Sequence, residues 1–312
     1  MRTEELTVNA SDGTPLHVYH WSADTDAKPR AVIHIAHGMA EHAGRYARFA
    51  ESLVNAGYEV FADDHRGHGK TARNNDDLGW FGAHHGWQIV VDDQKLLLRR
   101  AEEVHPGVPV VLFAHSMGSF IAQQTIAEMG DQLSAVVFSG SNGKPPPIAA
   151  AGKVLARLER WRLGPRGRSK VLTALSFGDY NKKFKPNRTA YDWLSRDEAE
   201  VDKYIADPRC GFDVTTQMWI DLLDALSAIS APELQARVPK TLPLFIVAGG
   251  EDPVSLKTKG LEQLLDAYRT AGLARVKHKF YAGARHEVLN ETNRDEVTRD
   301  VIAFLDEVLP RT

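Results

Sequence analysis

Short apolar runs alternate with segments of helical periodicity through most of the chain, and this alternation constrains the fold more than any other feature. Chains of this pattern build a mostly parallel sheet with helices on both faces. A run that is apolar along its whole length, such as 110–113, is typical of a strand buried on both sides. The sequence therefore predicts an α/β fold with a mostly parallel central sheet flanked by helices. The expected strands cover 5–8, 16–21, 32–36, 58–62, 108–113, 134–139, 242–248 and 276–281, and the expected helices cover 45–56, 86–103, 118–129, 257–270 and 294–308.

The alternation stops between residues 142 and 237, where three consecutive prolines open a stretch of helical, basic and aromatic character. Ligands bind at the carboxyl ends of parallel strands, so an insertion at that edge is expected to form the roof of a pocket. We predict a largely helical cap inserted after the sixth strand. The predicted units are a first part of the core over 1–142, the cap over 143–238 and a second part of the core over 239–312.

Composition and charge exclude several classes of protein. A formal net charge of −3 gives no electrostatic reason to bind nucleic acid. The single cysteine, Cys210, excludes an internal disulfide framework and fits a reducing compartment. No apolar stretch approaches the roughly 20 residues that span a bilayer, and the charged N-terminus does not resemble a signal peptide. We therefore expect a soluble, cytoplasmic protein.

The motif Ala114-His115-Ser116-Met117-Gly118 lies between an expected buried strand and an expected helix. A sharp strand-to-helix turn pushes its central residue outward, so the hydroxyl of Ser116 is expected at a positive helix terminus. The usual pattern is G-x-S-x-G, and Ala114 adds one methyl group at the first glycine position. A helix-capping serine is the alternative interpretation, but the strand–turn–helix context favours a nucleophile.

A serine hydroxyl is a weak nucleophile at neutral pH and needs a base. Hydrolases with this turn carry serine, then a carboxylate, then histidine along the chain. Asp252 and His286 each follow an expected strand, on loops at the same edge as Ser116. We predict Ser116 as the nucleophile, His286 as the base and Asp252 as the acid that orients the imidazole. Glu251 is the rival acid, but as the neighbour of Asp252 it would point elsewhere.

Backbone N–H groups that face the developing negative charge would form an oxyanion hole. One is expected from Met117, the residue after the nucleophile, and the other from Met39 in the loop after the strand 32–36. Core packing by the two methionine side chains is compatible with this role, which uses only the backbone. The turn and the loop are expected to be supported by Gly38, His115 and Gly118.

Four motifs together resemble a known family: HGMAEH at 37–42, DHRGHG at 64–69, HSMG at 115–118 and GARHE at 283–287. They are similar to the monoacylglycerol lipase and lysophospholipase group of α/β-hydrolases, which is related to the S33 serine aminopeptidases. The stretches 181–196 and 207–212 are similar to the cap of bacterial members, so the resemblance spans almost the whole chain. It implies the α/β-hydrolase fold, a lid-covered acyl pocket, and glycerol or lysophospholipid esters as substrates. The departure is Ala114, where the family normally has glycine.

These inferences lead to a serine carboxylic ester hydrolase that acts on monoacylglycerols or lysophospholipids through an acyl-enzyme, without a cofactor or metal. The 13 histidines form no H-E-x-x-H helix motif and no dense ligand run, which disfavours a metallohydrolase. A short-chain carboxylesterase, a serine aminopeptidase and a non-catalytic binding protein remain alternatives. An aminopeptidase needs acidic groups for the substrate ammonium, and the cap offers Glu159, Asp179 and Asp192.

Residues 144–188 carry 12 lysines and arginines against two acidic residues. The simpler interpretation is a solvated face of cap helices. The alternative is peripheral contact with an anionic lipid surface, aided by Trp161, Leu163 and nearby apolar residues. The expected partners are therefore a small lipid ester and, under this alternative, a membrane surface. The sequence does not indicate an oligomeric state.

Overall fold

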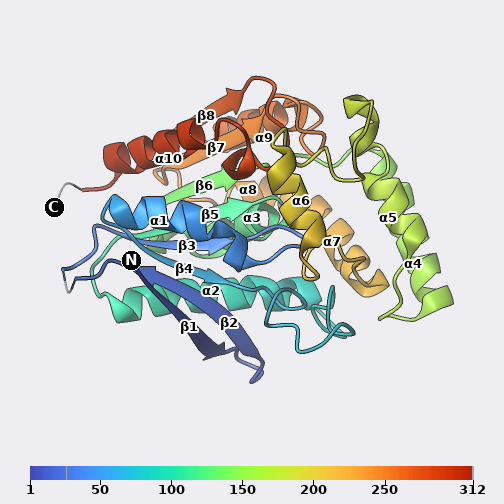
Figure 1. The fold of residues 1–312 in the computed structure, drawn as a ribbon, viewed down its shortest axis with the longest axis horizontal. Helices are drawn as coiled ribbons and strands as arrows, with labels where there is room; N and C mark the ends of the chain where they lie inside the picture. The colour runs from blue at the N-terminus through green and yellow to red at the C-terminus, as the bar shows by residue number, and fades with distance from the viewer. Residues whose placement is uncertain (26, 311–312) are drawn as a thin grey trace.

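The computed structural model describes residues 1–25 and 27–310, and eight strands within them form one sheet (Figure 1). The strand order is β1-β2-β4-β3-β5-β6-β7-β8. β1 and β2 pair antiparallel at one edge, β2 also pairs antiparallel with β4, and β3 through β8 run parallel to one another. The strands are β1 (Arg2–Asn9), β2 (Pro15–Ser22), β3 (Val32–Ala36), β4 (Glu59–Asp63), β5 (Val110–His115), β6 (Ala135–Ser139), β7 (Leu244–Gly249) and β8 (Val276–Tyr281).

Helices cover both faces of the sheet. Side chains of α1 and α10 share one buried apolar cluster with the sheet, and those of α2, α3 and α9 share a second cluster with it. The α-helices are α1 (Ala47–Asn55), α2 (Gly86–Val104), α3 (Met117–Met129), α4 (Ile148–Leu163), α5 (Lys170–Phe177), α6 (Glu198–Ala206), α7 (Thr216–Ile229), α8 (Pro232–Gln235), α9 (Lys259–Thr270) and α10 (Arg294–Val308). Short 3₁₀ helices are η1 (Ala43–Tyr46), η2 (Gly130–Gln132), η3 (Tyr180–Phe184) and η4 (Val288–Asn290).

The predicted α/β fold with a mostly parallel, helix-flanked sheet is confirmed. The central strands β3, β5, β6 and β7 are buried along their whole length, which is why they have continuous apolar runs. The expected elements differ from the observed ones only at their ends. For example, α9 begins at Lys259 rather than 257, because the three residues before it have positive φ angles of 55°, 57° and 72°.

Between β6 and β7 the chain forms α4 through α8 and η3. Figure 1 shows α4, α5, α6 and α7 gathered at one end of the sheet. Side-chain caps fix where three of these helices begin: Ser169 accepts from the Leu172 N–H of α5, Asp197 from N–H groups of α6, and Thr215 from the Met218 N–H of α7. The cap boundaries at 142/143 and 238/239 stay a prediction. Among the described residues, no helix is long and apolar enough to cross a bilayer.

Candidate active site

Ser116 forms the sharp turn between β5 and α3. Its φ of 50° and ψ of −120° are strained for a residue other than glycine. The Ser116 N–H donates to the Ser139 carbonyl at 2.9 Å, which ties the turn to the neighbouring strand. A Cβ at Gly118 would lie 2.4 Å from the Ala36 carbonyl oxygen, so no side chain fits there. Ala114 is fully buried inside β5, where the sheet accommodates its methyl group.

The structure brings together the three side chains predicted to act as nucleophile, base and acid. His286 Nε2 lies 2.9 Å from Ser116 Oγ, and His286 Nδ1 lies 3.0 Å from Asp252 Oδ1. Asp252 is fully buried on the loop after β7, and His286 is 3% exposed on the loop after β8. The Val254 N–H also donates to Asp252 Oδ1, at 2.9 Å, which holds the carboxylate toward the imidazole. The loops after β5, β7 and β8 thus place Ser116, Asp252 and His286 so that two hydrogen bonds join the three side chains.

Two buried histidines beside Ser116 have opposite shifts in pKa. Burial disfavours the charged form of His286, but the adjacent Asp252 carboxylate outweighs it and raises the pKa above the usual 6.5. His115 lies 4.8 Å from it, ring centroid to ring centroid, and contacts the Ser139 hydroxyl instead of a carboxylate. Burial and the charge of His286 lower the pKa of His115 to about 3. Of the two, His286 is the one suited to accept a proton near neutral pH.

The N–H groups of Met39 and Met117 have no hydrogen-bond acceptor within residues 1–25 and 27–310. Met117 is the first residue of α3, where N–H groups lack partners inside the helix. The loop with Met39 passes close to the nucleophile, since a Cβ at Gly38 would lie 3.1 Å from Ser116 Cβ. Both N–H groups are therefore unengaged in this structure, and their role as the oxyanion hole stays a prediction.

A buried ionic network that the sequence did not predict supports this loop. Glu41 Oε1 accepts from the Gly38 N–H at 2.6 Å and from the Tyr46 hydroxyl at 2.8 Å. Arg45 binds Glu41 and also forms two 2.7 Å hydrogen bonds to Glu287, the residue after His286. Burial opposes ionisation of Glu287, but the charge of Arg45 outweighs it and lowers the pKa to about 2. Glu41 belongs to the HGMAEH motif and Glu287 to the GARHE motif, but the spacing of the motifs did not predict that both bind Arg45.

Two residues of the histidine-rich loops have structural contacts. His37 Nδ1 donates to the Gly38 carbonyl at 2.7 Å, and its Nε2 accepts the His65 N–H at 3.0 Å. Burial and the charges of neighbouring histidines hold the pKa of His37 well below its usual value. The neutral imidazole therefore links the two loops through its hydrogen bonds. Arg66 pairs with two carboxylates in other segments, Asp12 and Asp93.

Side chains from the segment between β6 and β7 cover the histidine. The His286 N–H donates to the Trp193 carbonyl at 3.3 Å, and the two rings lie 5.2 Å apart. Phe177 and Tyr180 pack on Trp193 in turn. Met117 belongs to a buried apolar cluster with residues of α2, α4, α5 and α7. The side of the site that faces the segment between β6 and β7, beside Met117 and His286, is therefore apolar, and sequence reasoning assigned Trp193 no role.

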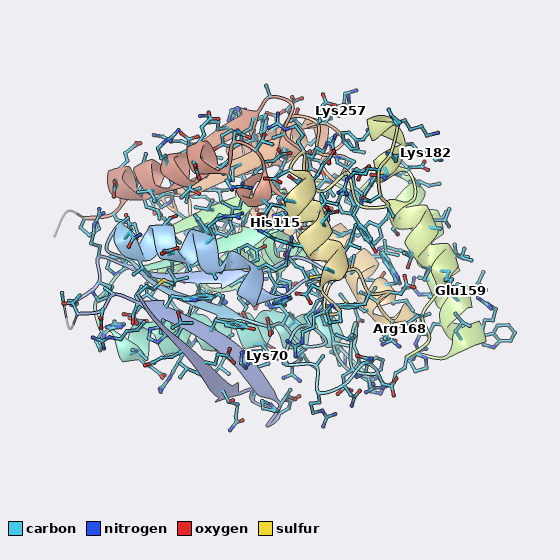
Figure 2. All side chains as sticks on the ribbon, viewed as in Figure 1. Lys70, His115, Glu159, Arg168, Lys182 and Lys257 are labelled. Atoms are coloured by element: carbon cyan, nitrogen blue, oxygen red, sulfur yellow. The ribbon has the colours of Figure 1, made fainter. Side chains whose placement is uncertain are left out.

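The rival acids have other partners. Glu251 pairs with Lys257 at 2.5 Å, so its carboxylate is not the partner of His286. The three cap carboxylates considered for a substrate ammonium group are all engaged: Glu159 by Arg162 and Ser169, Asp179 by Lys182, and Asp192 by Arg188 and Thr189. Figure 2 shows Glu159 and Lys182 at the end of the molecule away from His115. Each of the three already has a donor from its own segment as a partner.

The chain is similar to characterised proteins along nearly its whole length. Residues 27–293 match the family model described as serine aminopeptidase, S33. A monoacylglycerol lipase of Mycolicibacterium smegmatis is 31% identical, with 91% of this chain and 90% of that protein covered. A monoglyceride lipase of Homo sapiens is also 31% identical, over 94% of this chain and 86% of that protein. The crystal structure of a thermostable carboxyl esterase from Bacillus coagulans, in complex with glycerol, superposes with a TM-score of 0.89 at 27% identity and covers 99% of both chains.

Proposed function

The chain belongs to the serine aminopeptidase S33 family of α/β-hydrolases, and from this premise we propose that it hydrolyses single-chain lipid esters, monoacylglycerols before lysophospholipids. As a member of this family it is a serine hydrolase. The observation that carries the proposal is the hydrogen-bonded chain from Asp252 through His286 to Ser116 in an apolar setting. The proposed catalytic residues are these three, with the oxyanion held by Met39 and Met117.

In the proposed mechanism Ser116 Oγ attacks the ester carbonyl while its proton passes to His286 Nε2. Asp252 stabilises the imidazolium through Nδ1. The N–H groups of Met39 and Met117 stabilise the negative carbonyl oxygen. The imidazolium then protonates the leaving alcohol, and an acyl-enzyme remains. Water, deprotonated by His286, attacks the acyl group and releases the fatty acid and the free serine.

Two further observations favour a lipid ester over the alternatives. The apolar cluster around Met117 and the packed aromatic rings over His286 suit an acyl chain better than a charged group. The three cap carboxylates that an aminopeptidase could use are engaged by neighbouring donors. The two relatives named above, each 31% identical, are lipases of monoglycerides, which supports glycerol as the preferred head group.

The test compares kcat/KM for monoacylglycerols and lysophosphatidylcholines of matched chain length, with aminoacyl anilides alongside. We expect the glycerol esters to be hydrolysed at least about 10-fold more efficiently than the matched lysophospholipids, equivalent to about 1.4 kcal/mol of transition-state binding. Aminoacyl anilides should give no measurable turnover. Faster hydrolysis of the anilides would contradict the ester assignment, and equal rates for the two lipid classes would contradict the head-group preference.

We also propose that the outer face of α4 and α5 contacts anionic lipid surfaces. Large apolar side chains are exposed along these helices, led by Trp161 at 87% exposure. The others are Ile148, Val154, Leu158, Val171 and Leu175. In the same segment of the chain, the exposed residues Lys144, Lys170, Lys183 and Lys185 have no carboxylate partner among the described residues. Apolar side chains within a basic surface are the combination that interfacial helices use.

Co-sedimentation with vesicles tests this surface. At low salt the protein should sediment with phosphatidylserine-containing vesicles and remain in solution with phosphatidylcholine vesicles. Trp161→Ala should weaken binding several-fold, whereas Val104→Ala, which removes an exposed apolar side chain on α2, should not. Equal binding to both kinds of vesicle, or equal loss in the two variants, would contradict the proposal.

A further inference from the structure

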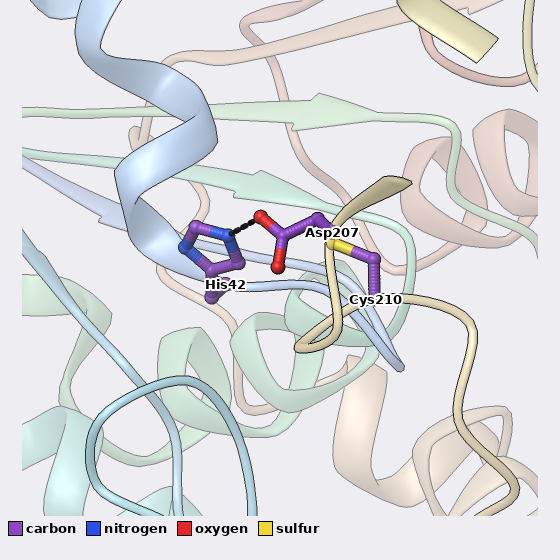
Figure 3. A group of neighbouring side chains, drawn as sticks. All are labelled: His42, Asp207 and Cys210. Carbon is purple, nitrogen blue, oxygen red and sulfur yellow. Dashed lines mark hydrogen bonds and ion pairs between the residues drawn. The ribbon is translucent and has the colours of Figure 1, made fainter. Parts of the chain in front are cut away.

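Three side chains of metal-ligating types meet where the turn after α6 contacts the loop 37–42: His42, Asp207 and Cys210 (Figure 3). One ligand atom from each lies within 4.8 Å of the others. His42 Nε2 and Asp207 Oδ2 are already 2.8 Å apart. Imidazole, carboxylate and thiolate are the ligands that zinc takes in proteins. Ligand atoms of a tetrahedral zinc ion lie roughly 3.5 Å from one another, so small side-chain shifts suffice.

The local backbone holds these ligands in position. The Cys210 N–H donates to the Asp207 carbonyl at 3.0 Å, which closes a turn that brings the two side chains together. The Arg209 N–H donates to Asp207 Oδ1 at 2.8 Å and leaves Oδ2 directed at His42. The turn is anchored to the loop by the Gly211 N–H, which donates to the Ala40 carbonyl at 2.9 Å. Two segments distant along the chain therefore present a preformed group of ligands.

We propose that His42, Asp207 and Cys210 bind one zinc ion, with water completing its coordination. The ion joins the turn at 207–210 to the loop that contains Met39. A hydrogen bond to the second ring nitrogen of a ligating histidine strengthens a metal site. His42 Nδ1 is buried and has no such partner among the described residues. We therefore expect an affinity in the micromolar range, weaker than that of a structural zinc site. The proposal does not depend on the substrate of the enzyme.

Calorimetric titration of the metal-free full chain with zinc chloride tests the site. One ion should bind per chain, and Cys210→Ser and Asp207→Asn should each weaken binding at least about 10-fold. His278→Gln, which removes an exposed imidazole on β8, is the matched control and should bind as the unaltered chain does. Unaltered affinity in Cys210→Ser, or an equal loss in His278→Gln, would overturn the proposal.

Cobalt provides a second readout that identifies the ligands. Co²⁺ added in place of zinc should produce the near-ultraviolet charge-transfer absorption of a thiolate–cobalt bond. This absorption should be absent in Cys210→Ser, and added zinc should remove it by displacing the cobalt. Stoichiometric cobalt binding without this absorption would overturn the assignment of Cys210. Thermal unfolding in the presence of a chelator checks that each variant is folded. If Cys210→Ser is unstable, the zinc affinity of Asp207→Asn still tests the site.

Discussion

The two sides of the candidate site are built in different ways. On the sheet side, Asp252 and His286 have exposures of 0% and 3%, and the strands β5 and β7 that precede Ser116 and Asp252 are buried throughout. On the other side, α4 and α5 expose large apolar residues, with Trp161 at 87%. Close packing permits little displacement of a side chain, whereas exposed helices are available for external contacts. We therefore expect changes on the sheet side to alter catalysis and folding, and changes on the α4–α5 face to alter surface binding.

The largest effect is expected from Ser116→Ala, which removes the proposed nucleophile on the sheet side. Turnover of a soluble ester should fall by about 10⁶-fold, the order observed when a hydrolase loses its serine. Thermal unfolding should change little, since the alanine can keep the backbone of the turn. Steady-state kinetics with a short-chain p-nitrophenyl ester gives the comparison, and a loss smaller than 10-fold would contradict the role of Ser116.

Asp252→Asn should lower kcat by about 10⁴-fold, because an amide cannot stabilise the imidazolium or select the correct tautomer. Glu251→Gln is the matched control in the same loop, since Glu251 pairs with Lys257 instead of His286. Its kcat should remain within a few-fold of the unaltered enzyme. Comparable losses of kcat in the two variants would show that catalysis depends on the loop as a whole and not on the Asp252 carboxylate.

The pH profile of these two variants should also differ. The base must be neutral to act, so kcat/KM falls as pH drops through the pKa of His286. Burial alone would lower this pKa, and the Asp252 carboxylate raises it above 6.5. The acidic limb of the unaltered enzyme should therefore lie above pH 6.5 and move to lower pH in Asp252→Asn. Glu251→Gln should leave the limb in place, and an unmoved limb in Asp252→Asn would contradict this electrostatic argument.

Gly118→Ala and Gly152→Ala compare the packing of the two sides directly. A Cβ at Gly118 would lie 2.4 Å from backbone oxygen, so the substitution should lower the free energy of unfolding by roughly 3 kcal/mol. A Cβ at Gly152 in α4 would have its nearest contact with Leu223 Cδ1, at 3.8 Å, so alanine there should raise stability by about 0.5–1 kcal/mol. Urea unfolding measures both, and destabilisation of similar size would contradict the contrast.

The smallest effect is expected from Trp161→Ala. At 87% exposure this side chain contributes little to the folded state, so the free energy of unfolding should change by less than about 0.5 kcal/mol. Hydrolysis of a soluble ester should stay within about two-fold. A large loss of activity toward soluble substrate would show that this helix acts on the chemistry and not only on surface binding.

The sheet and the positions of Ser116, Asp252 and His286 could be anticipated because they depend on local patterns. Buried parallel strands need continuous apolar runs, and loops at the carboxyl ends of such strands share one edge. The contact between Arg45 and Glu287 could not be anticipated, because it joins residues far apart in the chain whose types are common on surfaces. The same holds for Trp193 over His286, since an aromatic residue in the connection between η3 and α6 does not indicate what it will cover.

Active-site labelling tests the central claim most directly. A fluorophosphonate reagent should form one covalent adduct per chain, located on the peptide with Ser116 by mass spectrometry, at a rate that falls as His286 becomes protonated. An adduct on another serine, or labelling of Ser116→Ala at the rate of the unaltered enzyme, would contradict the assignment of Ser116 as the nucleophile.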